Sequence, residues 1–149
     1  MPLSGCVLRA CEFGDLEQVI QVEKASFPER PYGKLDFLSC ILLAQEGFVV
    51  ACVDESVVGY VIAMRKGREG MIQSIAVSPE FRQKGVGEAL MRSAIGHLSG
   101  RFRRAYLLVD SKNEPAIRLY RRLSFSETGK VIEKYYPNGG DAVEMVRML

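Results

Sequence analysis

The chain is 149 residues long, about the size of one ordinary domain, and 48% of its residues are hydrophobic. Such a chain can bury a real core, so intrinsic disorder is excluded and we expect a single domain over residues 1–149. Lysine and arginine number 20 and aspartate and glutamate 18, so the net charge is only +2. This balance argues against direct binding to nucleic acid or to a membrane surface. No apolar run of about 18 residues and no secretory signal pattern is present, so we expect a cytoplasmic protein.

The cysteines and the histidine exclude several kinds of site. Cys6, Cys11, Cys40 and Cys52 lie in none of the spacings of a zinc site, and His97 is the only histidine. Catalysis by a Cys–His or Ser–His pair is equally disfavoured. We therefore expect reduced thiols, in keeping with a cytosolic protein, and no bound metal.

The first half of the chain predicts a strand, two helices and three further strands. Asp15 is a plausible cap for the first helix, and Pro28 and Pro31 end it, because proline blocks helix continuation. The β-branched runs on either side of the acidic turn 54–56 predict a hairpin. The predicted elements are Cys6–Ala10, Asp15–Ala25, Lys34–Gln45, Phe48–Val53, Val57–Met64 and Gly70–Val77.

In the second half, helices and strands alternate. Asn113 is a plausible cap, with Pro115 in the first turn of the helix that follows it. The predicted elements are a helix at Gly87–Ser99, a strand at Arg104–Val109, a helix at Asn113–Leu123, and strands at Phe125–Val131 and Ala142–Arg147. Helices interleaved with strands, together with hairpins, predict an α/β fold with a mixed sheet and helices on both faces.

The most informative stretch is residues 75–87, where an apolar strand runs into a basic, glycine-bearing turn that opens a helix. Backbone N–H groups at such a helix start have no intrahelical partners, and a diphosphate is a natural ligand for them. Gly85 and Gly87 let the backbone approach a ligand closely, while Arg82 and Lys84 add positive charge. A solvated loop with glycines for tight packing is the alternative. The stretch matches neither a Walker A loop nor the complete dinucleotide fingerprint.

Two signatures resemble those of the GNAT family of acetyltransferases. Segment 82–87, RQKGVG, matches the [QR]-x-x-G-x-[GA] acetyl-CoA motif. Segment 113–125, NEPAIRLYRRLSF, is similar to N-x-x-A-x-x-L-Y-x-x-x-x-F, with Ser124 in place of the usual glycine. With the order of elements, the resemblance covers nearly the whole chain. It implies a central, mixed and splayed sheet of about seven strands with helices on both faces.

This resemblance implies direct transfer of an acetyl group from acetyl-CoA to an amine. The diphosphate would lie on the amides of residues 82–87, and the pantetheine would pair with the strand edge at 75–77. Tyr120 would donate a proton to the departing thiolate, its alternative being an ordinary buried tyrosine. Asn113 would contact the cofactor arm, and Ala116 is small enough to let it lie close. The implied cofactor-binding residues are Ile75, Ala76, Val77, Arg82, Gln83, Lys84, Gly85, Val86, Gly87, Asn113, Ala116 and Tyr120.

Two further segments indicate which kind of amine accepts the acetyl group. Segment 134–145 looks like the K-Y-Y-x-[DN]-G-x-D-A-x-x-M end of protein N-terminal acetyltransferases, which include the ribosomal-protein alanine acetyltransferases and archaeal relatives. The turn 27–29 is similar to their [FL]-P-E turn. The resemblance makes these segments two walls of a peptide groove and a protein N-terminus the substrate, with a ribosomal protein or an auxiliary subunit as candidate partners. The implied substrate-binding residues are Phe27, Pro28, Glu29, Tyr135 and Tyr136.

The general base is the main departure from the family. Relatives often carry Glu at the position of Leu108, and some carry His at the position of Met71. The remaining candidates are Glu29, which we take as the second catalytic residue, Asp110, and water held by Tyr135 or by backbone carbonyls. Packing of the loop tyrosines and a plain helix-terminal charge at Glu29 are the alternatives to these substrate roles.

A weak base suits an N-terminal amine. An α-amine has a pKa of about 7.8 and is about one third neutral near pH 7.5, whereas for lysine, with a pKa of about 10.4, the neutral fraction is about 0.1%. Burial can lower a lysine pKa, so this reasoning is not decisive. The alternatives are a lysine side-chain or small-amine acetyltransferase and a non-catalytic acyl-CoA-binding module.

Overall fold

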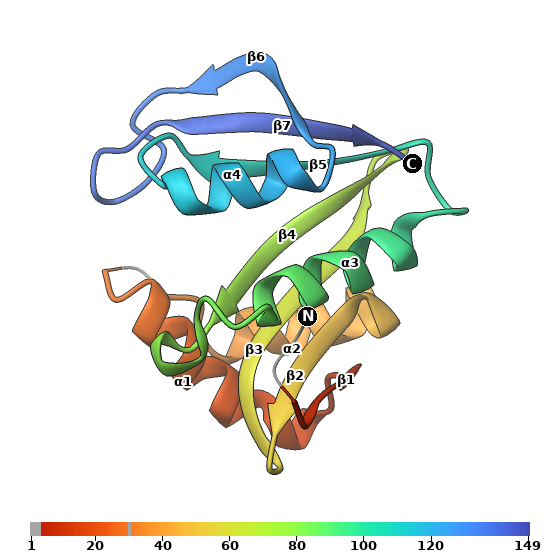
Figure 1. Cartoon of the computed structure of the whole chain (residues 1–149), viewed down its shortest axis with the longest axis vertical. Coiled ribbons are helices and arrows are strands. Elements are labelled where there is room, and N and C mark those ends of the chain that lie inside the picture. The colour runs from red at the N-terminus through yellow and green to blue at the C-terminus, as the bar shows by residue number, and fades with distance from the viewer. Residues whose placement is uncertain (1–3, 30) are drawn as a thin grey trace.

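The computed structural model describes residues 4–29 and 31–149, and it confirms the predicted order of elements. Figure 1 shows a sheet flanked by helices. The strands are β1 (Cys6–Ala10), β2 (Phe48–Val53), β3 (Ser56–Lys66), β4 (Glu69–Val77), β5 (Arg104–Asp110), β6 (Ser126–Ile132) and β7 (Ala142–Met148). The helices are α1 (Leu16–Ser26), α2 (Lys34–Ala44), α3 (Val86–Leu98) and α4 (Glu114–Arg122). Short 3-10 turns are η1 (Phe13–Asp15), η2 (Gln45–Gly47) and η3 (Pro79–Phe81).

The seven strands form one mixed sheet in the order β1-β2-β3-β4-β5-β7-β6. Every neighbouring pair is antiparallel except β4 and β5, which are parallel and pair only at Gly70 with Ala105 and at Met71 with Tyr106. Beyond these residues the two strands separate, as Figure 1 shows. The splayed, seven-stranded α/β sheet expected from the resemblance is therefore confirmed.

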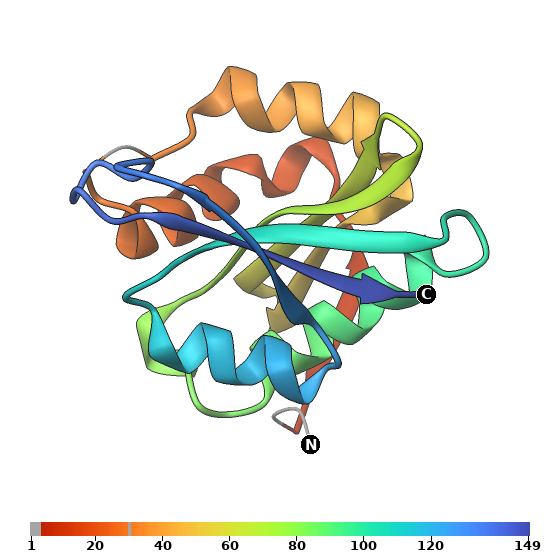
Figure 2. The same cartoon turned by 90° about the horizontal axis from the view of Figure 1, so that it is seen from above.

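Helices cover both faces of the sheet, as Figure 2 shows. Helices α1 and α2 pack on one face, around buried aromatic side chains that include Phe37, Phe48 and Tyr60. Helices α3 and α4 pack on the other face, where Leu90 and Ile117 belong to a second core cluster. These two cores hold the sheet between them and fix the positions of the loops at the open end of β4 and β5. No helix of the described residues is long and apolar enough to span a membrane.

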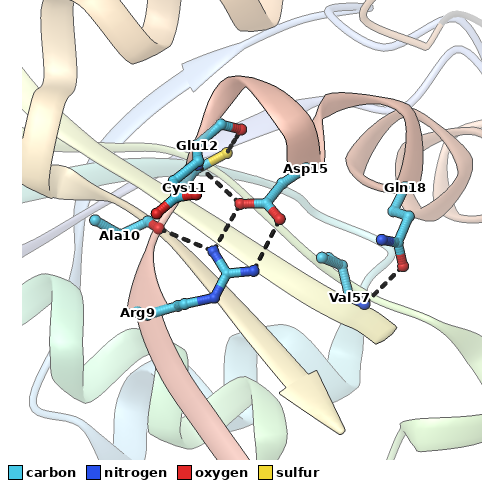
Figure 3. A network of polar contacts seen from close by, with 7 residues as sticks. All are labelled: Arg9, Ala10, Cys11, Glu12, Asp15, Gln18 and Val57. Carbon is cyan, nitrogen blue, oxygen red and sulfur yellow. Dashed lines mark hydrogen bonds and ion pairs between the residues drawn. The ribbon is translucent and has the colours of Figure 1, made fainter. Parts of the chain in front are cut away.

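The start of α1 is anchored by a charged network, drawn in Figure 3. Arg9 Nη1 and Nη2 donate to Asp15 Oδ2 and Oδ1 at 2.7 and 2.8 Å, and the Glu12 N–H donates to Oδ2 at 2.8 Å. Asp15 is the N-cap residue of α1, as predicted, but its side chain makes no capping hydrogen bond to the helix, because its carboxylate points back to Arg9 and Glu12. Gln18 Oε1 accepts the Val57 N–H at 2.9 Å and joins α1 to β3. These contacts fix where the far end of α1 lies.

The Arg9–Asp15 pair yields a stability prediction. Its hydrogen bonds hold the pKa of Asp15 below its ordinary value, so the stabilisation is present above about pH 4 and is lost as the pH falls through the folded-state pKa. We expect Asp15→Asn to lower the free energy of unfolding by about 1.5–3 kcal/mol at pH 7, measured by urea denaturation. This difference in unfolding free energy between wild type and Asp15→Asn should become smaller towards pH 3.

Glu17→Gln, at an exposed position in the first turn of α1, is the control and should change stability little at either pH. An Asp15→Asn deficit that is equal at pH 3 and pH 7 contradicts the assignment of the stabilisation to the charged carboxylate.

Candidate active site

The separation of β4 from β5 leaves a strand edge open. The Ser78 N–H donates to the Val58 carbonyl of β3 at 2.8 Å. Because backbone groups alternate sides along a strand, those of Ala76 also face β3, while those of Ile75 and Val77 face the opening. An extended ligand with amide groups can pair there as an added strand. Of the predicted triplet, Ile75 therefore offers both backbone groups and Val77 its N–H, since the Val77 carbonyl accepts from Arg82, whereas Ala76 is buried beneath α1 and α2.

The turn after β4 is shaped to bind an anion. Gln83 and Gly85 have φ values of +60° and +82°, and α3 begins directly after Gly85. No side chain caps this helix start, so the first N–H groups of α3 are open to a ligand at the positive end of the helix dipole. Left-handed residues in such a turn direct successive N–H groups into one concavity. This geometry fits a diphosphate.

The basic side chains of the turn have different surroundings. Arg82 Nε donates to the Val77 carbonyl at 2.9 Å, and Nη2 donates to Ser26 Oγ at 3.1 Å. Arg82 thus joins the turn to the ends of β4 and α1, a contact that the sequence did not indicate. The Lys84 ammonium lies over the Phe81 ring, 5.7 Å from its centroid, and Lys84 is exposed. Lys84 is the side chain that remains available to an anion.

Helix α4 presents a buried phenol to the opening. Asn113 Oδ1 accepts the Ala116 N–H at 3.3 Å, so the predicted cap is confirmed. Tyr120 is 7% exposed, and its ring packs edge-on against Phe125 with centroids 6.2 Å apart. Burial raises the pKa of Tyr120 to about 12, and its hydroxyl has no hydrogen-bond partner within the described residues. The phenol therefore keeps its proton at neutral pH and can donate it.

The β6–β7 loop carries Tyr135 and Tyr136, whose rings meet edge-on at 5.0 Å. Asn138 Nδ2 donates to Asp110 Oδ2 at 3.0 Å, and Asn138 Oδ1 accepts the Gly140 N–H at 2.7 Å. A Cβ at Gly140 would lie 2.6 Å from Asp110 Oδ1, so the close approach needs glycine. Asp110, one of the candidate bases, instead holds the tyrosine loop against the end of β5.

The α1–α2 turn lies on the other side of the opening. In both cartoon views it is at the same end of the molecule as the β6–β7 loop (Figures 1 and 2). Phe27 is 43% exposed on this turn, and Glu29 is exposed as well. Tyr32, which the sequence did not single out as a site residue, accepts a hydrogen bond from Gln73 Nε2 at 3.3 Å through its hydroxyl. Burial raises the pKa of Tyr136, and nearby acidic groups raise it further: Tyr135, Asp110, Tyr120 and Tyr32. The α1–α2 turn and the β6–β7 loop therefore lie at one end of the molecule.

A bulge in β4 adds polar side chains on the α1 side of the opening. The β3–β4 register steps from Ile62 opposite Ser74 to Ala63 opposite Ile72, which leaves Gln73 as the extra residue. Gln73 and Ser74 therefore project to the same face, where Gln73 contacts Tyr32 and Ser74 Oγ lies 2.9 Å from the Tyr60 hydroxyl. Nothing in the local sequence pattern indicates this bulge.

Behind Ser74 lies a buried carboxylate. Tyr60 donates to Glu23 Oε1, and the Tyr32 N–H donates to Glu23 Oε2 at 2.8 Å. Glu23 is 2% exposed. It occupies the apolar face of α1, three and four residues along from Ile20 and Val19, and an acidic residue at a core position is a signal that the sequence did contain.

Met71 and Leu108 occupy the two positions where relatives carry a base, and neither side chain can accept a proton. Met71 is buried, and Leu108 lies opposite Glu144 of β7. Glu144 accepts a hydrogen bond from Thr128 Oγ1 at 3.0 Å. Within the described residues, no three His, Cys, Asp or Glu side chains gather as a metal site would require.

Comparisons with known proteins agree with this geometry. The model of the family described as "Acetyltransferase (GNAT) family" matches residues 15–125. The chain is 33% identical to an N-alpha-acetyltransferase of Saccharolobus solfataricus over 95% of this chain and 92% of the relative. It is 31% identical to the spermidine N(1)-acetyltransferase of Escherichia coli strain K12, over 89% and 78%. The structure of Ard1 from Thermoplasma volcanium is similar with a TM-score of 0.91 and 28% identity, over 97% and 98%.

The family match and the site agree on the same chemistry. An open strand edge, an anion-binding turn and a buried phenol suit an extended cofactor with amide groups, a diphosphate and a reactive thioester. The chain therefore belongs to the GNAT family and is an N-acetyltransferase that uses acetyl-CoA.

Proposed function

We propose that the enzyme acetylates the free α-amine at the N-terminus of a protein or peptide. The observation that carries this proposal is that the α1–α2 turn, with Phe27 and Tyr32, and the tyrosine loop held by Asp110 lie at the same end of the molecule (Figures 1 and 2). Relatives named N-alpha-acetyltransferase support the same substrate class.

Residues of the strand edge and the turn would hold the cofactor. The backbone groups of Ile75 and the N–H of Val77 would pair with the pantetheine arm, and the amides of residues 82–87 would bind the diphosphate. Asn113 and Ala116 would border the arm at the start of α4. When bound, acetyl-CoA supplies an acetyl group activated as a thioester.

Tyr120 would act as the general acid. Its hydroxyl proton would pass to the sulfur as the bond between acetyl carbon and sulfur breaks. A pKa near 12 means that this proton is present across the neutral range, and the unpartnered hydroxyl is ready to donate. The buried edge contact with Phe125 holds the ring in position.

The peptide would lie between the walls. Tyr135 and Tyr136 would bond the peptide main chain through their hydroxyls, and Phe27 and Pro28 would line the pocket for the first side chain. Glu29, exposed on the turn, would face the α-amine. Tyr136 is half-buried and keeps its hydroxyl proton because burial raises its pKa, so it would serve as a donor. Asp110 and Asn138 would keep both tyrosines in place.

An acetyltransferase of a small polyamine is the second candidate, favoured by the similarity to a spermidine acetyltransferase. Near pH 7.5 an α-amine is about one third neutral, against about 0.1% for an unperturbed lysine side chain. A polyamine needs several acidic groups to bind its charges; the Asp110 carboxylate near the loop is engaged in hydrogen bonds, and Glu29 alone would have to serve the others. The site thus suits an α-amine better.

Binding of the cofactor is expected to depend on the left-handed glycine of the turn. Gly85→Val places a branched side chain where φ is +82°, so the turn amides should leave their positions. We expect at least tenfold weaker acetyl-CoA binding, about 1.4 kcal/mol, by calorimetry. Gly96→Val is the matched control, because a Cβ there meets nothing within 4 Å. Wild-type affinity in a folded Gly85→Val variant would refute the cofactor assignment.

Removal of the Tyr120 hydroxyl is expected to slow the chemical step. Tyr120→Phe should lower kcat by about 10-fold to 10³-fold and leave acetyl-CoA affinity unchanged. Because the pKa is about 12, Tyr120 stays protonated from pH 7 to 9, and the ratio of wild-type to variant rates should not change over that range. Steady-state kinetics with calorimetry checks this, and a variant with wild-type turnover excludes the acid role.

The substrate is tested by competition. A peptide with a free N-terminus should be acetylated at its α-amine at least tenfold faster than spermidine or a blocked peptide that carries one lysine, as mapped by mass spectrometry. Tyr135→Phe and Glu29→Gln should impair peptide kinetics without altering acetyl-CoA binding. Acetylation mainly on lysine side chains or on spermidine would show that the proposed substrate is wrong.

A further inference from the structure

Three elements contribute one buried chain of hydrogen bonds beneath the opening. Ser74 Oγ of β4 lies 2.9 Å from the Tyr60 hydroxyl of β3, and Tyr60 in turn donates to Glu23 Oε1 of α1. Tyr60 is fully buried and Glu23 nearly so, whereas Ser74 is partly exposed. The chain therefore has one end in the core and the other at the surface of the site.

The protons in this chain can be assigned from its donors and acceptors. The single hydroxyl proton of Tyr60 goes to the Glu23 carboxylate, which can only accept while it is ionised. Ser74 must then donate its own proton to the Tyr60 oxygen. The lone pairs of Ser74 Oγ are left free to accept a proton from a group in the site.

Ser74 is well placed to meet the incoming amine. It precedes Ile75, whose backbone groups face the opening, and it lies on the α1 side of the sheet, onto which the bulge also brings Gln73 with its contact to Tyr32. Glu29 lies exposed on the α1–α2 turn, and two other carboxylates near the site are engaged elsewhere. Asp110 holds the tyrosine loop, and Glu144 accepts a hydrogen bond from Thr128.

The surroundings of Glu23 tune it as a proton acceptor. Burial is the largest effect and raises the pKa of Glu23, and Asp36 of α2 raises it further. Hydrogen bonds from the Tyr32 N–H and from the Tyr60 hydroxyl lower the pKa of Glu23, because they stabilise its ionised form. A carboxylate with a raised pKa is closer to the working pH, where a base is most efficient.

We propose that Ser74, Tyr60 and Glu23 form a proton relay that serves as the general base of the acetyl transfer. As the neutral amine nitrogen bonds to the acetyl carbon, its proton passes to Ser74 Oγ, the Ser74 proton to Tyr60, and the Tyr60 proton to Glu23. The bond between carbon and sulfur breaks, and the sulfur takes the proton of Tyr120. Afterwards the proton on Glu23 returns through Tyr60 and Ser74 to solvent, and solvent returns a proton to Tyr120.

The relay accepts a proton from any amine that reaches the acetyl carbon. It rests on the acetyltransferase activity and not on the identity of the substrate, so the two proposals can fail independently. Ser74 is the residue that touches the substrate, and Tyr60 and Glu23 act through it.

The test is a pH profile of kcat/KM at saturating acetyl-CoA, with whichever of a free-amine peptide or spermidine the wild-type enzyme acetylates faster. Ser74→Ala should lower kcat/KM at least tenfold at pH 7, and the deficit should narrow towards pH 9.5, where solvent-derived base replaces the relay. Ser74→Thr keeps a hydroxyl and should restore most of the rate. Glu144→Gln, which changes a carboxylate outside the relay, should behave as wild type.

A double-mutant cycle separates a relay from a structural role. Glu23→Gln should change the pH profile in the same way as Ser74→Ala, and the double variant should be no slower than either single one, because both break the same chain. Calorimetric affinity for acetyl-CoA and thermal unfolding confirm that each variant is folded. If Glu23→Gln does not fold, the comparison of Ser74→Ala with Ser74→Thr still tests whether the reaction needs the Ser74 hydroxyl.

Two results would overturn the relay. One is a wild-type pH profile and rate in Ser74→Ala. The other is a double variant whose loss of kcat/KM equals the product of the two single losses, with pH profiles unchanged. Two residues that act only on packing would behave in that way.

Discussion

The site depends on the short contact between β4 and β5. The strands pair only at Gly70 with Ala105 and Met71 with Tyr106. At Gly70 a Cβ would lie 3.0 Å from Leu98 Cδ2, so the lack of a side chain lets α3 press against the sheet where the two strands meet. Beyond that point β5 pairs along its whole length with β7 and follows it away from β4. The open edge of β4, with the backbone groups of Ile75, faces this opening.

The two cores give the opening two chemically different sides. Tyr120 belongs to the core under α3 and α4, and burial there raises the pKa of its phenol, so that it stays a proton donor. Tyr60 belongs to the core under α1 and α2, where burial also raises the pKa of Glu23. In the proposed reaction one face supplies a proton and the other accepts one. The sheet separates the two groups, which belong to different cores.

Local sequence patterns determined most of the fold and the cofactor side of the site. The order of strands and helices follows from hydrophobic periodicity and from breakers such as Pro28, and these signals act within a few residues. Three further features could be predicted because each is encoded in one short segment. They are the helix cap at Asn113, the inward position of Tyr120 and the turn around Gly85. The resemblance to a family added the chemistry that these segments serve.

Only the tertiary structure decided which distant side chains meet. The Asp15 carboxylate binds Arg9 rather than the first amides of α1, and the Asp110 carboxylate holds a loop, because their partners lie where the strand register places them. The bulge at Gln73 and the chain from Ser74 to Glu23 join residues of β4, β3 and α1. Local patterns carry no information about contacts between residues 37 positions apart, such as Glu23 and Tyr60, since strand register and helix placement set those distances.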